Sequence, residues 1–154
     1  GRRPDAATMA ARALSLCDGD AALMANAHGF AGFNLADWGK YDEAALAYES
    51  GLAAAGKAGV PRREGWIYGL AAWGWLRSGK LDLAADWARQ SVVICDRLEW
   101  LAFRSWPETV LAEAELIGGA DGRNCVALAR RLGPGAGPPC PTAGPGVADG
   151  TPEG

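Results

Sequence analysis

Small and apolar residues recur at helical spacing along most of this chain, and short glycine-containing breaks interrupt them at a fixed interval. Gly39, Gly79 and Gly119 each end one such stretch, and the spacing from the first to the second equals that from the second to the third. Around the second break, amphipathic helices are predicted over residues 66–77 and from residue 81 onward. A repeat as long as the segment from Gly39 to Gly79 is typical of arrays in which pairs of antiparallel helices stack side by side. The pattern therefore predicts an all-α solenoid.

The period predicts about three antiparallel helical hairpins within residues 5–132. The three units are expected at 19–56, 61–97 and 100–132, and the last of them weakens into a short final helix over 123–132. Residues 5–17 match the second helix of a unit without its first, so we expect the array to begin in mid-repeat. Because the chain also starts without Met, we expect it to be a segment of a longer protein.

Composition changes sharply at residue 133. Residues 133–154 hold six of the nine prolines and seven of the 22 glycines, and they have almost no large apolar side chain. Such a segment cannot bury enough surface to offset the entropy lost on ordering. The sequence therefore predicts a disordered tail that follows the helical domain.

The overall composition narrows the function classes. Apolar residues make up 49% and charged residues 21% of the 154 positions, as in an ordinary globular domain. A net charge of −3 argues against direct contact with nucleic acid, and no apolar run reaches the roughly 20 residues of a membrane span. We expect a cytoplasmic protein that contacts neither nucleic acid nor membrane.

The chain has four cysteines and one histidine, a set that does not favour metal or redox chemistry. Cys17, Cys95, Cys125 and Cys140 form no C-x-x-C pair, so no structural metal site is expected. Cys17 and Cys95 fall at equivalent places two units apart, too far for a disulfide. We interpret them as buried thiols of a reducing compartment.

The first two units resemble the tetratricopeptide repeat. The resemblance covers residues 5–132, and the third unit departs from the pattern at Asp121 and Asn124. In this family, small residues let helix backbones approach closely and bulky residues fill the space between units. The positions that carry the resemblance are Gly32, Gly39, Lys40, Tyr41, Ala44 and Tyr48 in the first unit, Tyr68, Ala72, Trp75, Gly79, Leu81 and Ala84 in the second, and Leu111, Ala112 and Gly119 in the third.

The unit, measured from Gly39 to Gly79, is longer than the family's usual length of roughly 34 residues. We expect the extra residues in longer connections, at 56–61 and around 97–101. The first helix of the third unit is then expected to start at Trp106, with Pro107 in its first turn and Glu108 beside the helix N-terminus. Longer units of this kind, together with residues 98–108, are loosely similar to the repeat arrays of large bacterial transcription regulators of the LuxR and maltose-regulator types.

Six of the seven tryptophans lie between positions 66 and 106. The tetratricopeptide resemblance implies that the first helix of each unit presents selected positions to a concave groove. Trp75 and Tyr68 fall at packing positions, whereas for Trp66, Trp73 and Trp106 both a groove and a core location stay open. The implied groove positions are Asn26, Phe33 and Asp37 in the first unit, Trp66, Trp73 and Arg77 in the second, and Trp106, Thr109 and Glu113 in the third.

No catalytic arrangement is evident. His28 falls at a packing position without a nucleophile placed beside it, and the chain has no phosphate-binding glycine loop, so we expect no enzyme and no cofactor. An aromatic groove favours a protein–peptide interaction module, the sensor or scaffold part of a larger cytosolic regulator. One alternative is a small-molecule receptor with a tryptophan-rich groove. The simplest alternative is a structural spacer. The open ends of the array are expected to allow self-association.

Overall fold

The computed structural model describes residues 3–118, and all of their regular structure is α-helical. The helices are α1 (Arg3–Leu16), α2 (Ala21–Asp37), α3 (Tyr41–Ala58), α4 (Pro61–Arg77), α5 (Leu81–Arg97) and α6 (Leu101–Ile117). The predicted all-α class is confirmed for this part of the chain. The final short helix, the tail, Cys125 and Cys140 lie outside the described residues.

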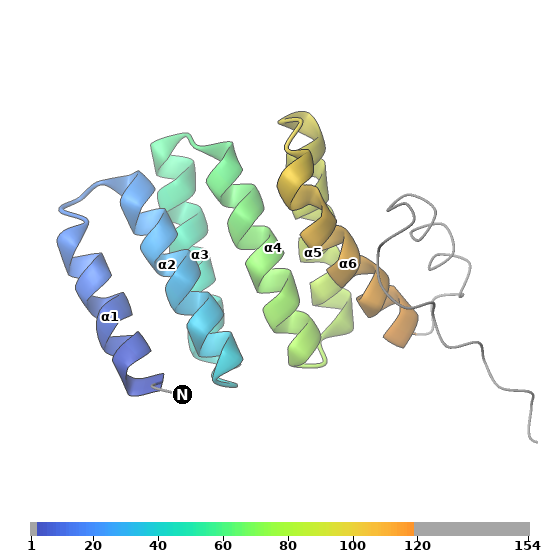
Figure 1. Ribbon diagram of the computed structural model, residues 1–154, viewed down its shortest axis with the longest axis horizontal. Helices are drawn as coiled ribbons and strands as arrows, with labels where there is room; N and C mark the ends of the chain where they lie inside the picture. Colours follow the sequence, from blue (N-terminus) through green and yellow to red (C-terminus); the bar gives the residue numbers. More distant parts are fainter. Residues whose placement is uncertain (1–2, 119–154) are drawn as a thin grey trace, which may run out of the picture.

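The helices form two layers (Figure 1). Helices α2, α4 and α6 lie side by side in one layer, where α4 contacts both of the others, and α3 and α5 lie behind them. Each helix also contacts the next one along the chain. This arrangement is compatible with the predicted array of hairpins, and it places the first helices of all three units on one face.

The same backbone motif ends four successive helices. After α2, Gly39 has φ of 79°, its N–H bonds Ala36 O at 3.0 Å, and Lys40 N–H bonds Leu35 O at 2.9 Å. This pair of bonds is a Schellman motif, which glycine favours because it needs a left-handed residue. Equivalent motifs end α3, α4 and α5. Their left-handed residues are Gly59, Gly79 and Glu99, with φ of 64°, 77° and 51°.

The structural repeat of this motif is therefore one helix rather than one hairpin, and the expected long connections do not exist. Helix α3 continues to Ala58 and α4 already begins at Pro61, so the additional residues lengthen the helices. The predicted start of the third unit's first helix was also wrong, because α6 begins at Leu101 and contains Pro107 inside it. Tertiary contacts hold the early turns of α6: the ring of Phe103 lies where a Cβ at Gly69 would be 2.9 Å from its Cζ.

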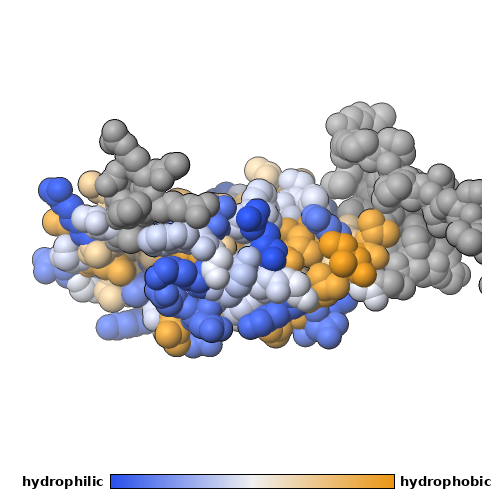
Figure 2. Space-filling model, turned by 90° about the horizontal axis from the view of Figure 1, so that it is seen from below, coloured by the Kyte–Doolittle hydropathy of each residue, from blue (hydrophilic) through white to orange (hydrophobic). Residues whose placement is uncertain are grey.

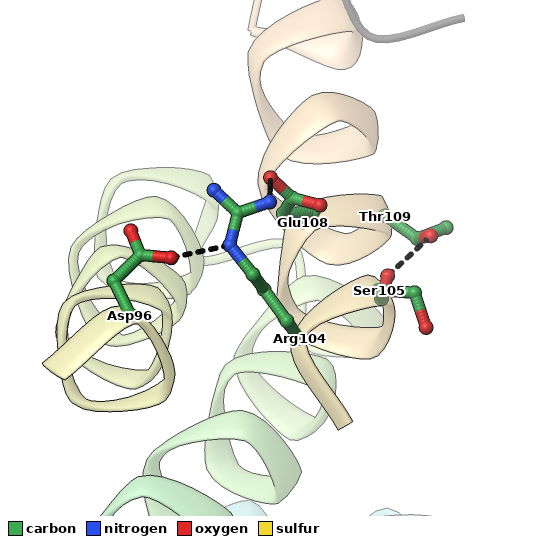
Figure 3. Close-up of polar contacts among 5 residues, drawn as sticks. All are labelled: Asp96, Arg104, Ser105, Glu108 and Thr109. Carbon is green, nitrogen blue, oxygen red and sulfur yellow. Dashed lines mark hydrogen bonds and ion pairs between the residues drawn. The ribbon is translucent and has the colours of Figure 1, made fainter. Parts of the chain in front are cut away.

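Glu108 does not lie at a helix N-terminus but in an ion pair (Figure 3). Arg104 on α6 donates from Nε to Asp96 on α5 at 2.5 Å, and from its terminal nitrogen to Glu108 one turn further along α6. The side chain of Glu108 is only 8% exposed, whereas that of Asp96 is 54% exposed. The hydrogen bond to Asp96 raises the pKa of the Arg104 guanidinium, which keeps its charge beside a buried carboxylate. The network fixes the start of α6 against the end of α5.

Small residues dominate the core and bring the helices close together. The main cluster includes Ala25, Ala44 and Ala71, and the ring of Tyr48 fills the space between them. Tyr48 is 1% exposed, and its hydroxyl donates to Leu70 O at 3.4 Å. Burial raises the pKa of this phenol well above its ordinary value. Cys17 and Cys95 are buried with free thiols, as expected.

Apolar side chains are exposed at both ends of the described array. On α1 these are Met9 and Leu16, and on α6 they are Leu116 and Ile117. Figure 2 shows an apolar patch on the underside of the molecule. Self-association through these ends stays a prediction. No helix in residues 3–118 combines the length and the apolar character that crossing a membrane requires.

Candidate partner-binding face

Five aromatic side chains of α2, α4 and α6 form two groups of contacting rings, which we together call the aromatic row. Helices α2, α4 and α6 share one layer, so residues on their common face come together although they lie far apart in sequence. Four of the five were predicted for the groove, and the fifth, Phe30, was not. The members of the row are Phe30, Phe33, Trp66, Trp73 and Trp106.

Trp73 is the centre of the row. The ring of Phe33 on α2 stacks on it, with centroids 4.9 Å apart and an interplanar angle of 24°. From the other side, Trp106 on α6 lies 6.5 Å away at 41°. The guanidinium carbon of Arg77 is 4.8 Å from the Trp73 ring centroid, one turn along the same helix. The structure therefore brings four predicted groove residues from three helices into one contact chain.

Trp66 continues the row two turns away from Trp73 on α4. Its ring meets Phe30 edge to face, with centroids 4.8 Å apart. A Cβ at Gly29 would be 2.5 Å from Cζ3 of Trp66, so only glycine lets α2 approach this ring. Phe30 is not among the groove positions that the family resemblance implies. Its spacing of three from Phe33 was the signal that places both on one face.

The aromatic row is neither core nor fully open. Trp66 and Trp73 are half-buried, and both pack against buried clusters. Trp106 is 39% exposed and Phe30 is 58% exposed. Trp106 Nε1 donates to Gly69 O at 3.1 Å, which fixes the ring while leaving its outer face accessible. Fixed and partly exposed rings offer contact area without much loss of side-chain entropy on binding.

The remaining predicted residues differ in how they relate to the row. Within residues 3–118, no hydrogen bond or ion pair links Asp37 or Glu113 to it, and both side chains are exposed. The Thr109 hydroxyl donates to Ser105 O within α6 at 2.8 Å (Figure 3). Asn26 is half-buried and lines a cavity beside Trp66.

That cavity has a volume of about 230 Å³ and opens beside the Trp66 end of the row. On one wall, the guanidinium carbon of Arg62 lies 4.3 Å from the ring centroid of Trp100, which in turn stacks on Phe103 with centroids 4.6 Å apart. On another wall, Arg63 Nε donates to Ala22 O at 2.9 Å. The lining residues are Asn26, Val60, Arg62, Arg63, Trp66 and Trp100.

A second cavity, of about 390 Å³, lies between α5 and α6. Its wall includes Glu115, which occupies the position equivalent to Trp75 one unit later. In the preceding unit Trp75 is buried, and Tyr41 and Ala45 pack against its cluster. Glu115 instead pairs with Arg89 at 3.0 Å. The change from an indole to a carboxylate at equivalent positions accounts for the open space.

Trp75 and Tyr68 pack as predicted. Trp75 is 7% exposed and meets Trp87 edge to face at 6.1 Å, and Tyr68 meets the same indole at 5.2 Å. His28 is half-buried beside Gly51, and burial lowers its pKa below the ordinary value of 6.5. Residues 3–118 contain no group of three or more His, Cys, Asp or Glu side chains that could hold a metal ion.

Comparison of the chain with protein-family models, with curated proteins and with solved structures found no match. We therefore infer function from the geometry of the aromatic row and of the cavity beside it.

Proposed function

We propose that the chain is a non-catalytic interaction module that binds a peptide segment of a partner protein along the aromatic row. The observation that carries this proposal is the exposure of Phe30, which meets Trp66, and of Trp106, which lies beside the Phe33–Trp73 stack. Aromatic anchors that are held rigidly and stay accessible dominate the energetics of protein interfaces. A segment with apolar side chains at helical or extended spacing matches such a surface.

The wider role follows from the loose resemblance to bacterial regulators. In that role the chain is the sensor or scaffold part of a larger cytosolic protein, and the aromatic row receives a signal in the form of a bound partner. A repeat array with such a face can perform this role without chemistry of its own.

The test is a selection of short random peptides on the immobilised full chain. We expect enrichment of peptides with aromatic or aliphatic residues at a fixed spacing. Enrichment is lost in Phe30→Ala and Trp106→Ala, because these truncate the accessible rings. Leu101→Ala is the matched control, since Leu101 is 73% exposed on α6 but outside the row. Peptide motifs that are the same in all four proteins would refute the proposal.

A small-molecule receptor is the second candidate, and the cavity lined by two indoles favours it. Its volume of about 230 Å³ is below the roughly 300–1,000 Å³ of usual small-molecule sites, which weighs toward a single peptide side chain. Intrinsic tryptophan fluorescence against a metabolite panel separates the two functions. A change with a small ligand that Trp66→Phe abolishes would favour the receptor.

A further inference from the structure

The cavity beside Trp66 has a guanidinium group whose hydrogen-bonding capacity is unused. The guanidinium of Arg62 lies over the ring of Trp100, and within residues 3–118 it makes no hydrogen bond or ion pair. A guanidinium carries five N–H donors in its plane. The contact with the indole restricts this side chain and leaves its N–H donors available. Arg104 on α6 shows the contrast, because it is bonded to both Asp96 and Glu108.

Two other polar side chains, Arg63 and Asn26, line the same cavity. Arg63 is held in place by its Nε bond to Ala22 O, and the amide of Asn26 also faces the lining. The lining contains two arginines and no acidic residue, in a chain whose net charge is −3. The cavity therefore complements an anion, and a planar guanidinium pairs best with a carboxylate, which it can bind through two parallel bonds.

The cavity and the aromatic row are continuous through Trp66. One part of this indole meets Phe30 in the row, and the same residue lines the cavity. A ligand that lies along the row would thus pass the cavity mouth. The cavity volume suits one side chain better than a separate small molecule.

We propose that the cavity of Arg62, Arg63 and Asn26 binds the carboxylate of an Asp or Glu side chain in the peptide that occupies the aromatic row. This inference rests on the proposed function, and it adds a charge requirement and a direction to it. The carboxylate lies at the Trp66 end, and the apolar anchors of the same peptide lie toward Trp73 and Trp106. Charge pairing of this kind sets register and specificity more than total affinity.

The test compares peptides selected on the full wild-type chain, on Arg62→Gln and on Arg97→Gln. Wild-type selection should enrich an acidic residue at a fixed spacing from the apolar motif. Arg62→Gln should enrich the same apolar motif without the acid. Arg97→Gln, an exposed arginine at the end of α5, is the matched control and should behave as wild type. Circular dichroism verifies that the variants keep their helicity.

A synthetic enriched peptide and its Glu→Gln (or Asp→Asn) version then give the magnitude. The neutral peptide should bind the wild type about tenfold or more weakly, and should bind Arg62→Gln no more weakly than the acidic peptide does. An apolar motif without acid preference, or an equal loss in Arg62→Gln, would overturn this inference and leave the proposed function standing. If wild-type selection yields no apolar motif, both fail.

Discussion

The ring of Tyr48 on α3 lies so close to the backbone of Gly32 on α2 that a Cβ at position 32 would be 2.6 Å from its Cε1 atom. Because Tyr48 is 1% exposed, its ring has no open space into which it could move. This contact sets the spacing of the α2–α3 hairpin, and with it the position of Phe30 and Phe33 on α2.

Gly32→Ala should therefore destabilise the protein by about 1–3 kcal/mol, the usual cost of inserting a methyl group into a packed core. Gly56→Ala is the control, because the nearest atom to a Cβ there is 3.9 Å away. Replacing this helical glycine should instead stabilise by up to about 1 kcal/mol. Urea denaturation of both variants measures the difference. Equal effects would show that the contact with Tyr48 does not limit how closely α2 and α3 approach each other.

Trp75 fills the space between units, but its Nε1 has no hydrogen-bond partner among the described residues. Trp75→Ala should cost about 3–5 kcal/mol through the cavity it leaves. Trp75→Phe should cost much less, since it retains a ring and removes an unsatisfied buried donor. Thermal unfolding of the two variants tests this order. A phenylalanine variant as unstable as the alanine variant would contradict this order.

Glu108 depends on Arg104 for its buried charge. Arg104→Ala should destabilise by roughly 1–3 kcal/mol, because it leaves a buried carboxylate unpaired. Asp96→Asn should change stability by less than about 1 kcal/mol, as expected for an exposed member of an ion pair. Denaturant unfolding of the two single variants provides the comparison. Similar losses from both would show that the pair with Glu108 contributes little.

His28 should make stability pH-dependent just below neutrality. Its folded pKa is lowered from 6.5 by burial, so the unfolded chain binds more protons between the two pKa values. The contribution of His28 is therefore constant above pH 6.5, and stability falls as the pH drops from 6.5 toward the folded pKa. His28→Gln should lack this part of the pH dependence. Melting temperatures of both proteins across this range test it, and parallel curves would exclude His28 as the cause.

The helical period could be found from sequence because it has a local physical cause. Gly39 and Gly79 adopt the left-handed conformation that ends a helix, and glycine is the residue that does so most readily. The shorter repeat, of one helix, was missed because Glu99 occupies the same conformation without being glycine. Gly59, which does belong to the series, was assigned to a long connection instead.

The remaining features could not be predicted from the sequence, because they depend on contacts between helices. Pro107 suggested a helix start, but the packing of Phe103 against Gly69 and the bond from Arg104 to Asp96 hold more than one further turn of helix before it. The face that carries Trp66, Trp73 and Trp106 followed from the family resemblance. The stacking of Arg62 on Trp100 did not, because it depends on how the start of α4 approaches the start of α6, which no local pattern specifies.

The most direct test of the central claim is the affinity of a selected peptide for Trp106→Ala, measured by isothermal titration calorimetry beside wild type and Leu101→Ala. We expect a loss of about tenfold or more for Trp106→Ala, as for an interface anchor, with helicity retained and with Leu101→Ala binding as wild type does. Undiminished affinity of a folded Trp106→Ala protein would contradict the claim that partners bind along the aromatic row.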